Sequence, residues 1–312
     1  MTSRLGVETP PRVSTPRRRH QGGGAFKYLA VLPLIVLILG LIAFPLGAMI
    51  WMAFGQVRIV AGQFDYTPIG FGNFERIPAD TTFITSLVNS AVFIIATVVI
   101  TVVLGTILAL LTDRMVRGQQ LFQNVLILPA IIAPVVISII WLLLLSPQFG
   151  LINKVLSALH LPIQTLLGQK AGAMAAIIGV DVWHWTPIVF LFVYTALRGI
   201  DSSVIEAASV DGASAFQTAR SVILPLLVPA IVGAAAIRVV MGVKVFDEMY
   251  LLTFGGPGDA TTVISIYLRS VIFDRFDYGY GAALSLTVLL IMLVVILLGL
   301  GARGLTRRFR SA

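Results

Sequence analysis

Residues 84–112 read ITSLVNSAVFIIATVVITVVLGTILALLT, and this run contains no charged side chain. A helix of about 20 mostly apolar residues crosses the hydrocarbon core of a bilayer, so the run is long enough to span a membrane. The alternating segments of about ten residues that mark a membrane β-barrel are missing. Five further apolar stretches of comparable length occur at residues 28–55, 121–147, 171–197, 226–253 and 281–302. The sequence therefore predicts an all-α, polytopic integral membrane protein with six transmembrane helices.

The overall composition also indicates a membrane protein. Of the 312 residues, 58% are hydrophobic and 12% are charged, and the mean hydropathy is +0.97. Soluble proteins average about 25% charged residues, so a cytosolic enzyme and a disordered regulator are both excluded. The chain has no cysteine, which excludes disulfides, thiolate nucleophiles and cysteine-ligated metal sites.

The basic residues predict the orientation of the chain. The net charge of +8 fits either a nucleic-acid partner or the basic loops on the cytoplasmic side of a membrane. The distribution favours the loops, because 14 of the 22 Lys and Arg fall in alternate segments, residues 1–27, 113–120, 198–225 and 303–312. We therefore expect a multi-pass protein of the plasma (inner) membrane, with both termini cytoplasmic, the lipid bilayer around it and no nucleic-acid partner.

Three domains are predicted along the chain. Residues 1–27 include three consecutive arginines and three consecutive glycines, and they are expected to form a disordered basic cytoplasmic tail. Residues 28–302 form the six-helix transmembrane domain, and residues 303–312 form a second cytoplasmic tail. The first apolar stretch is much longer than the 7–15 apolar residues of a signal peptide, so an uncleaved helix is favoured over a signal peptide.

The cytoplasmic segment 200–225 reads IDSSVIEAASVDGASAFQTARSVILP and predicts two short helices. Ser203 and Glu206 have the spacing of a capping box, which would begin the first helix. Gly212 would end it, because glycine enters a left-handed turn at low cost. The compact helical loop fits either a docking element for a partner's groove or an ordinary amphipathic loop.

The second short helix of this segment would begin at another capping box, formed by Ser214 and Gln217. Pro225 would end the helix and redirect the chain towards the fifth apolar stretch.

The same segment resembles the EAA loop of ABC importer membrane subunits. That motif is E-A-A, three residues, G, nine residues and I-x-L-P. Its positions here are Glu206-Ala207-Ala208, Gly212 and Val222-Ile223-Leu224-Pro225, with valine in place of the first isoleucine. Asp201 stands where the family often has proline, and aspartate can cap a helix start instead. The stretches 71–74, 148–153 and 255–258 resemble the carbohydrate-uptake, maltose-type subfamily, in particular the half related to its larger membrane subunit.

This resemblance covers residues 28–302 and implies the type I ABC importer permease fold. It implies an assembly with a second homologous permease subunit, two ATPase subunits and an external substrate-binding protein. The chain would be a sugar transport subunit rather than an enzyme. It would bind no cofactor, since ATP and Mg belong to the ATPases, and it would hold no catalytic or metal site. The loop 199–225 would couple to the ATPases through Glu206, Ala207, Ala208, Asp211, Gly212, Leu224 and Pro225.

Ionisable residues inside the spans are the candidate substrate path, because they are costly in lipid and usually functional. Asp181, His184 and Arg238 are such residues. The resemblance places the sugar-contacting positions near Ala130, Pro134, Asp181, His184, Trp185, Arg238, Met241, Gly242 and Val245. Arg238 has two interpretations, both left open: it binds an anionic group of a modified sugar, or it pairs with Asp181 or Glu248.

Three charged residues near the end of the fifth apolar stretch receive a different interpretation. Lys244, Asp247 and Glu248 are expected to form a solvated rim or subunit contacts rather than a binding site.

Other functions remain as alternatives. A secondary transporter or channel would also use charged spans, but it has no reason to carry the docking loop. A permease for amino acids, polyamines, phosphate or glycerol phosphate would share that loop, and glycerol phosphate importers also share much of the 255–258 region. A membrane enzyme is disfavoured because the sequence offers no catalytic constellation. The pattern G-x-G-x-x-G at 299–304 lacks the strand and the acidic residue that a dinucleotide site requires.

Overall fold

The computed structural model describes residues 24–60, 62–160 and 165–310. The described residues fall into two compact units, which divide between Trp51 and Met52. The first unit contains most of helix α1 (Gly24–Ala53), which includes Pro33 and Pro45. Most of the predicted basic tail lies outside the described residues, and α1 begins within the remainder of it. The apolar side chains of α1 are exposed over most of its length, as lipid contact requires.

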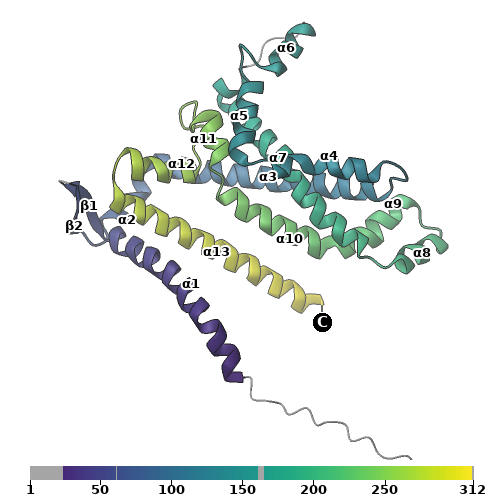
Figure 1. Cartoon of the computed structure of the whole chain (residues 1–312), viewed down its shortest axis with the longest axis horizontal. Coiled ribbons are helices and arrows are strands. Elements are labelled where there is room, and N and C mark those ends of the chain that lie inside the picture. The colour runs from purple at the N-terminus through teal and green to yellow at the C-terminus, as the bar shows by residue number, and fades with distance from the viewer. Residues whose placement is uncertain (1–23, 61, 161–164, 311–312) are drawn as a thin grey trace, which may run out of the picture. The chain divides into compact units, whose positions relative to one another are not determined.

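Long helices form the centre of the second unit (Figure 1). Helix α3 (Thr81–Asp113) packs along α7 (Lys170–Arg198), and both contact α10 (Leu224–Val243). On α3, hydroxyl groups face inward and apolar side chains face outward: Thr97 and Thr101 are buried, whereas Val99 and Val103 are exposed. The Thr97 hydroxyl donates to the carbonyl of Phe93 at 2.8 Å. This pattern suits a lipid surround, where small and polar side chains gather at helix interfaces.

The third predicted span is not one straight helix. Among the described residues, five helices are long and apolar enough to cross a membrane, or six if α4 (Gln119–Ile131) and α5 (Pro134–Leu144) count as one span. These two helices meet at an angle of 96°. The bend follows from Pro134, because a proline disfavours helical conformation in the residue before it, and Ala133 is extended.

The fifth predicted span has different ends from those expected. Helix α10 stops at Val243, and residues 247–253 form a separate helix, α11 (Asp247–Thr253). At its other end, α9 (Ala215–Thr218) passes through a π-helical turn, η3 (Ala219–Ile223), directly into α10. The prediction that Pro225 redirects the chain is therefore wrong. Pro225 lies in the first turn of α10, where its missing N–H is tolerated.

A small hairpin is an exception to the predicted all-α class. Strands β1 (Gly55–Val60) and β2 (Gln63–Pro68) pair antiparallel, with Gly55 opposite Pro68. The Asn73 amide of α2 (Gly72–Glu75) donates to the carbonyls of Ala53 and Gly55 at 3.0 and 2.9 Å. Gly279 must be glycine, because a Cβ atom there would lie 2.1 Å from the Gly55 carbonyl oxygen.

The remaining elements connect the long helices. The last helix, α13 (Tyr278–Arg310), continues through most of the predicted C-terminal tail. The short elements are η1 (Ile77–Ala79), α6 (Leu151–Ala158), η2 (Leu166–Gly168), α8 (Ser202–Val210), α12 (Ile264–Arg269) and the π-helical η4 (Ser270–Asp274).

Asp80 joins α3, α12 and α13 just outside the membrane spans. Its carboxylate caps α3 by accepting from the Phe83 N–H at 2.9 Å, and it also accepts from the phenols of Tyr267 and Tyr280. Burial alone would raise the pKa of Asp80, but these hydrogen bonds lower the pKa overall. Burial and the bond to Asp80 raise the pKa of Tyr267 to about 12, so this phenol stays a donor.

Asp80→Asn is expected to lower the free energy of unfolding by about 1–2 kcal/mol at pH 7, because the bonds lose a charged acceptor. A lowered carboxylate pKa gives stability that is present above the unfolded value of about 3.9 and is lost as the pH falls through the folded value. Thermal unfolding in detergent at pH 7 and at lower pH tests both points. The deficit of the variant should shrink in acid, and Asp65→Asn, in the exposed hairpin, serves as the control. A deficit that is equal at both pH values would contradict the assignment.

Candidate functional site

A buried ion pair joins the long helices. Nη2 of Arg238 on α10 donates to Oδ1 of Asp181 on α7, and the two residues are 1% and 2% exposed. Nε of Arg238 lies 3.4 Å from the hydroxyl of Thr101 on α3. Nη1 has no hydrogen-bond partner among the residues that the structure describes. Of the two interpretations of Arg238 that the sequence left open, the geometry shows the pairing with Asp181.

A second buried pair lies on the same face of α7. His184 Nδ1 lies 3.5 Å from Oε1 of Glu248, and His184 Nε2 lies 3.1 Å from the carbonyl oxygen of Ile132. The break between α4 and α5 makes that carbonyl available as a hydrogen-bond acceptor. Since a carbonyl can only accept, Nε2 carries a proton. Glu248 is 4% exposed, so the predicted solvated position is wrong: α11 folds back onto α5 and α7 and carries Glu248 inside.

A cavity of about 200 Å³ opens beside these pairs. Five of the nine residues predicted for the substrate path line it: Pro134, Asp181, Trp185, Met241 and Val245. The other lining residues are Lys244, Phe246, Asp247 and Glu248. The three charged residues assigned to a rim thus belong to the cavity wall. Sequence reasoning missed Phe246, whose position next to Val245 was the available signal.

The remaining predicted path residues, His184, Gly242, Arg238 and Ala130, do not line the cavity. The His184 ring stacks on Trp185 with centroids 4.2 Å apart, and so supports the cavity wall. Gly242 packs on Ile94, where a Cβ atom would approach to 3.1 Å. Arg238 is paired with Asp181, which itself lines the cavity. Ala130 is half-buried on α4.

The cavity walls combine carboxylates, an ammonium group and aromatic rings. Asp181, Asp247 and Glu248 supply acceptors, Lys244 is exposed, and Trp185 supplies an aromatic face. Carboxylate oxygens accept hydrogen bonds from hydroxyl groups, and aromatic faces cover apolar C–H surfaces. This arrangement can bind a polyhydroxylated solute.

The segment 200–225 forms two short helices, as predicted, but the first begins differently. Asp201 caps α8 by accepting from the Ser203 N–H at 2.9 Å. The capping box of Ser203 and Glu206 is therefore wrong, because the helix begins at Ser202 and Ser203 lies within it. The second capping box is confirmed: Ser214 Oγ accepts from the Gln217 N–H at 3.3 Å, and Gln217 Oε1 accepts from the Ser214 N–H at 2.7 Å.

The predicted coupling residues divide between this loop and the start of α10. Glu206, Ala207, Asp211 and Gly212 are exposed, and Gly212 has a φ of +76°, which suits glycine between two helices. Ala208 and Leu224 are half-buried, and Pro225 is exposed; the last two belong to α10 rather than to the loop. In Figure 1, α8 and α9 lie beyond the end of α10.

The loop rests on the helix bundle through Ile205. This side chain packs against a buried cluster that includes Ala109 of α3, Val193 of α7 and Ile223 of η3. Its neighbour Glu206 is exposed. Two apolar side chains of the loop, Val210 and Phe216, are 87% and 70% exposed, and sequence reasoning did not select them.

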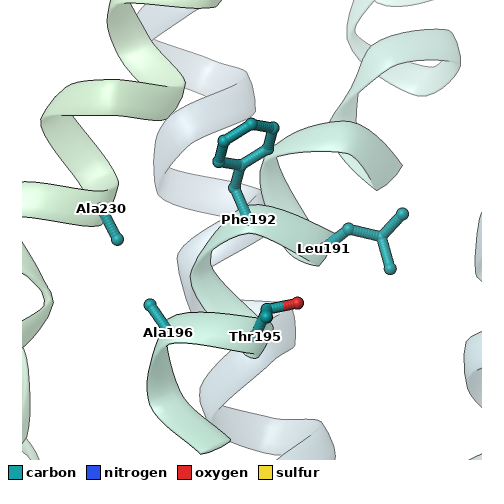
Figure 2. Close-up of a pocket in the computed structure, with 5 residues that line it drawn as sticks. All are labelled: Leu191, Phe192, Thr195, Ala196 and Ala230. Carbon is teal, nitrogen blue, oxygen red and sulfur yellow. The ribbon is translucent and has the colours of Figure 1, made fainter. Parts of the chain in front are cut away.

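A separate open hollow of about 520 Å³ lies between α7 and α10. Figure 2 shows Leu191, Phe192, Thr195 and Ala196 of α7 and Ala230 of α10 around it. These lining residues offer one hydroxyl and no charge, so the hollow has little to offer a polar solute.

Comparison with known proteins places the chain in a family. Residues 101–311 match the family described as binding-protein-dependent transport system inner membrane component. The trehalose/maltose transport system permease protein MalF of Thermococcus litoralis is 31% identical over 82% of this chain and 86% of its own length. The trehalose transport system permease protein SugA of Mycobacterium tuberculosis is also 31% identical, over 82% of this chain and 81% of its own length.

A solved structure supports the fold. It is a chain of a bacterial alginate ABC transporter in complex with an alginate pentasaccharide-bound periplasmic protein. That chain has a TM-score of 0.77 and 22% identity, with coverage of 88% of this chain and 92% of the other. The protein therefore belongs to the family of inner membrane components of binding-protein-dependent transport systems, and it is a multi-pass membrane transport subunit rather than an enzyme.

Proposed function

We propose that this chain is the membrane-spanning subunit of an ATP-driven importer that takes a sugar from an external binding protein into the cytoplasm by alternating access. The observation that carries the proposal is the loop α8–α9. There Glu206 is exposed on α8, and its neighbour Ile205 packs this helix against the buried cluster of the bundle. The partners are a second permease subunit, two ATPase subunits and the binding protein. The trehalose and maltose systems of the relatives support the sugar class.

The loop converts partner movement into movement of a span. Glu206 enters the groove of an ATPase subunit, and closure of the ATPases around ATP and Mg displaces α8 and α9. Because α9 passes through η3 into α10 without an intervening coil, the displacement reaches α10, which carries Arg238 and Met241. Met241 lines the cavity. The chemistry belongs to the ATPases, and this chain changes which side of the membrane the cavity faces.

The cavity favours a neutral sugar over an anionic one. Arg238 is already paired with Asp181, and Asp247 and Glu248 add two carboxyl groups to the wall. These carboxylates would repel an anionic solute, whereas the hydroxyl groups of a neutral sugar can donate hydrogen bonds to them. Lys244 is the one cation in the lining, so phosphorylated solutes such as glycerol phosphate are the alternative.

Reconstitution of the whole transporter in liposomes tests the proposal. The ATPase rate is measured with the binding protein and a panel of neutral, phosphorylated and acidic sugars and glycerol phosphate. Stimulation by a neutral sugar that depends on the binding protein is the expected result. A phosphorylated or acidic solute as the sole stimulant would overturn the neutral-sugar assignment. Uptake by the chain without any ATPase subunit would overturn the importer and favour a secondary transporter.

Trp185→Ala should raise the KM for sugar uptake about fivefold, because an aromatic face is worth about 1 kcal/mol. Trp183→Ala is the matched control, since Trp183 is 44% exposed and packs edge-on against Trp141 rather than lining the cavity. Uptake is measured against sugar concentration in the same liposomes. Equal changes in the two variants would show that Trp185 acts through packing alone.

A further inference from the structure

The cytoplasmic end of α3 is fastened to the docking loop by one side chain. Arg114 follows the last residue of α3, and its Nη2 donates to the carbonyl oxygen of Ala215 at 2.7 Å. Ala215 is the first residue of α9. The two residues are 101 positions apart in the sequence, and no motif in the sequence marks Arg114.

The acceptor occupies a special place in the backbone. The Ala215 carbonyl also accepts from the N–H of Ala219, the residue at which α9 passes into the π-helical turn η3. The Arg114 guanidinium therefore holds the loop at its junction with the helix that leads into the membrane. π-Helical turns of this kind often occur at functional positions.

The end of α3 is itself tied to its neighbours. Asp113 accepts from Nη1 of Arg198 on α7 at 3.3 Å. Gln119 at the start of α4 donates to the carbonyl of Thr112 at 3.1 Å and to the hydroxyl of Tyr194 on α7 at 2.7 Å. Arg114 therefore links the loop to an end of the bundle where α3, α4 and α7 are hydrogen-bonded to one another. Movement at Ala215 is thus transmitted to α3.

From this end, α3 leads to the buried ion pair. Thr101, which interacts with Arg238, lies thirteen residues before Arg114, or about 20 Å along the helix. Helix α3 packs against α7 and α10, which carry Asp181 and Arg238. The loop thus has two connections to the ion pair: one through α9, η3 and α10, and one through Arg114 and α3.

We propose that Arg114 is a positioning residue that transmits displacement of the docking loop to α3, so that α10, which carries Arg238, and α3, which contacts Arg238 through Thr101, both move with the ATPases. The inference rests on the proposed function, since it requires the loop to be driven by ATP. Without Arg114, the loop would move α10 while α3 lagged behind. Hydrolysis would continue, and a smaller share of cycles would move substrate.

The side chain is suited to transmission rather than to folding. Arg114 and Ala215 are both exposed, so water can replace the lost bond. The bond is charge-assisted and directed at a backbone carbonyl, which makes it short and independent of the side chain at position 215. A defect in coupling with normal assembly is therefore the signature that separates transmission from a structural role.

The test uses the full transporter in liposomes with its binding protein and the sugar that stimulates the wild type. ATP hydrolysed per sugar imported is measured for Arg114→Ala, Arg114→Lys and the matched control Arg117→Ala, which removes an exposed arginine of the same short segment. Co-purification of the ATPase subunits reports assembly. Arg114→Ala should raise the ratio about three- to tenfold with normal assembly. Arg114→Lys should restore part of the coupling, because an ammonium can reach a carbonyl as a donor, and Arg117→Ala should match the wild type.

This inference alone is overturned by an unchanged ratio in Arg114→Ala or by an equal rise in Arg117→Ala. Loss of the ATPase subunits from the Arg114→Ala complex would also overturn it, because Arg114 would then be a docking contact. Absence of binding-protein stimulation in the wild type would instead contradict the proposed function. These failures are distinguished within one set of measurements.

Discussion

Glu206→Lys is expected to abolish sugar uptake while the chain still folds and inserts into the membrane. Glu206 is exposed on α8, and no ion pair with it is found among the described residues, so the substitution leaves the folded subunit intact. In the assembly, a lysine would face the basic side chain that Glu206 is proposed to meet. Replacing one partner of a buried interfacial charge pair costs about 2–5 kcal/mol, which is a loss of at least thirtyfold in docking affinity.

The measurement combines uptake, ATPase rate and co-purification of the ATPase subunits. Uptake should fall to background, and any remaining hydrolysis should no longer respond to the binding protein. Glu75→Lys is the control, because Glu75 is an exposed glutamate of α2, outside the loop. Normal uptake by Glu206→Lys would remove the docking role from α8.

Arg238→Ala should destabilise the folded subunit by about 3–5 kcal/mol. The substitution leaves the Asp181 carboxylate buried without its partner, and unpaired buried charges are far more costly than a missing pair. The double variant Asp181→Leu with Arg238→Met removes both charges at similar volume and should recover most of the loss. Thermal unfolding of Arg238→Ala and of the double variant in detergent, each compared with the wild type, forms the test.

The same variants separate stability from transport. The double variant should fold and assemble, yet import slowly, because Asp181 no longer offers an acceptor in the cavity wall. A double variant as unstable as Arg238→Ala would show that the pair does not account for the loss. A selective loss of anionic substrates in Arg238→Ala, with neutral sugars unaffected, would restore the anion-binding interpretation.

The parts of this fold that depend on composition were predictable from the sequence. The charge-free run 84–112 lies within α3, and the second capping box lies at the predicted residues. The breaks were harder to predict, since hydropathy measures how apolar a stretch is and not where its helix ends. Pro134 and the turn before Asp247 divide two apolar stretches that read as continuous.

The sequence also could not predict which residues far apart in the chain interact. Sequence left two possible partners for Arg238, because Asp181 and Glu248 are both acidic and both lie near membrane segments. Only the packing of α7 against α10 decides between them. Glu248 was misplaced for the same reason, since its burial depends on the fold of α11 onto α5. The bond of Arg114 to a backbone carbonyl leaves no trace in side-chain chemistry at position 215.

The unbroken passage from α9 through η3 into α10 has a consequence for engineering. Each residue of an α-helix turns the chain by about 100°. One residue added or deleted within the α-helical residues 224–237 would therefore turn Arg238 by about 100° relative to the loop, even if every side chain of the loop were kept. Residues 200–214 precede the continuous helical run that begins at Ala215. A docking loop taken from a related transporter should therefore be joined before Ala215.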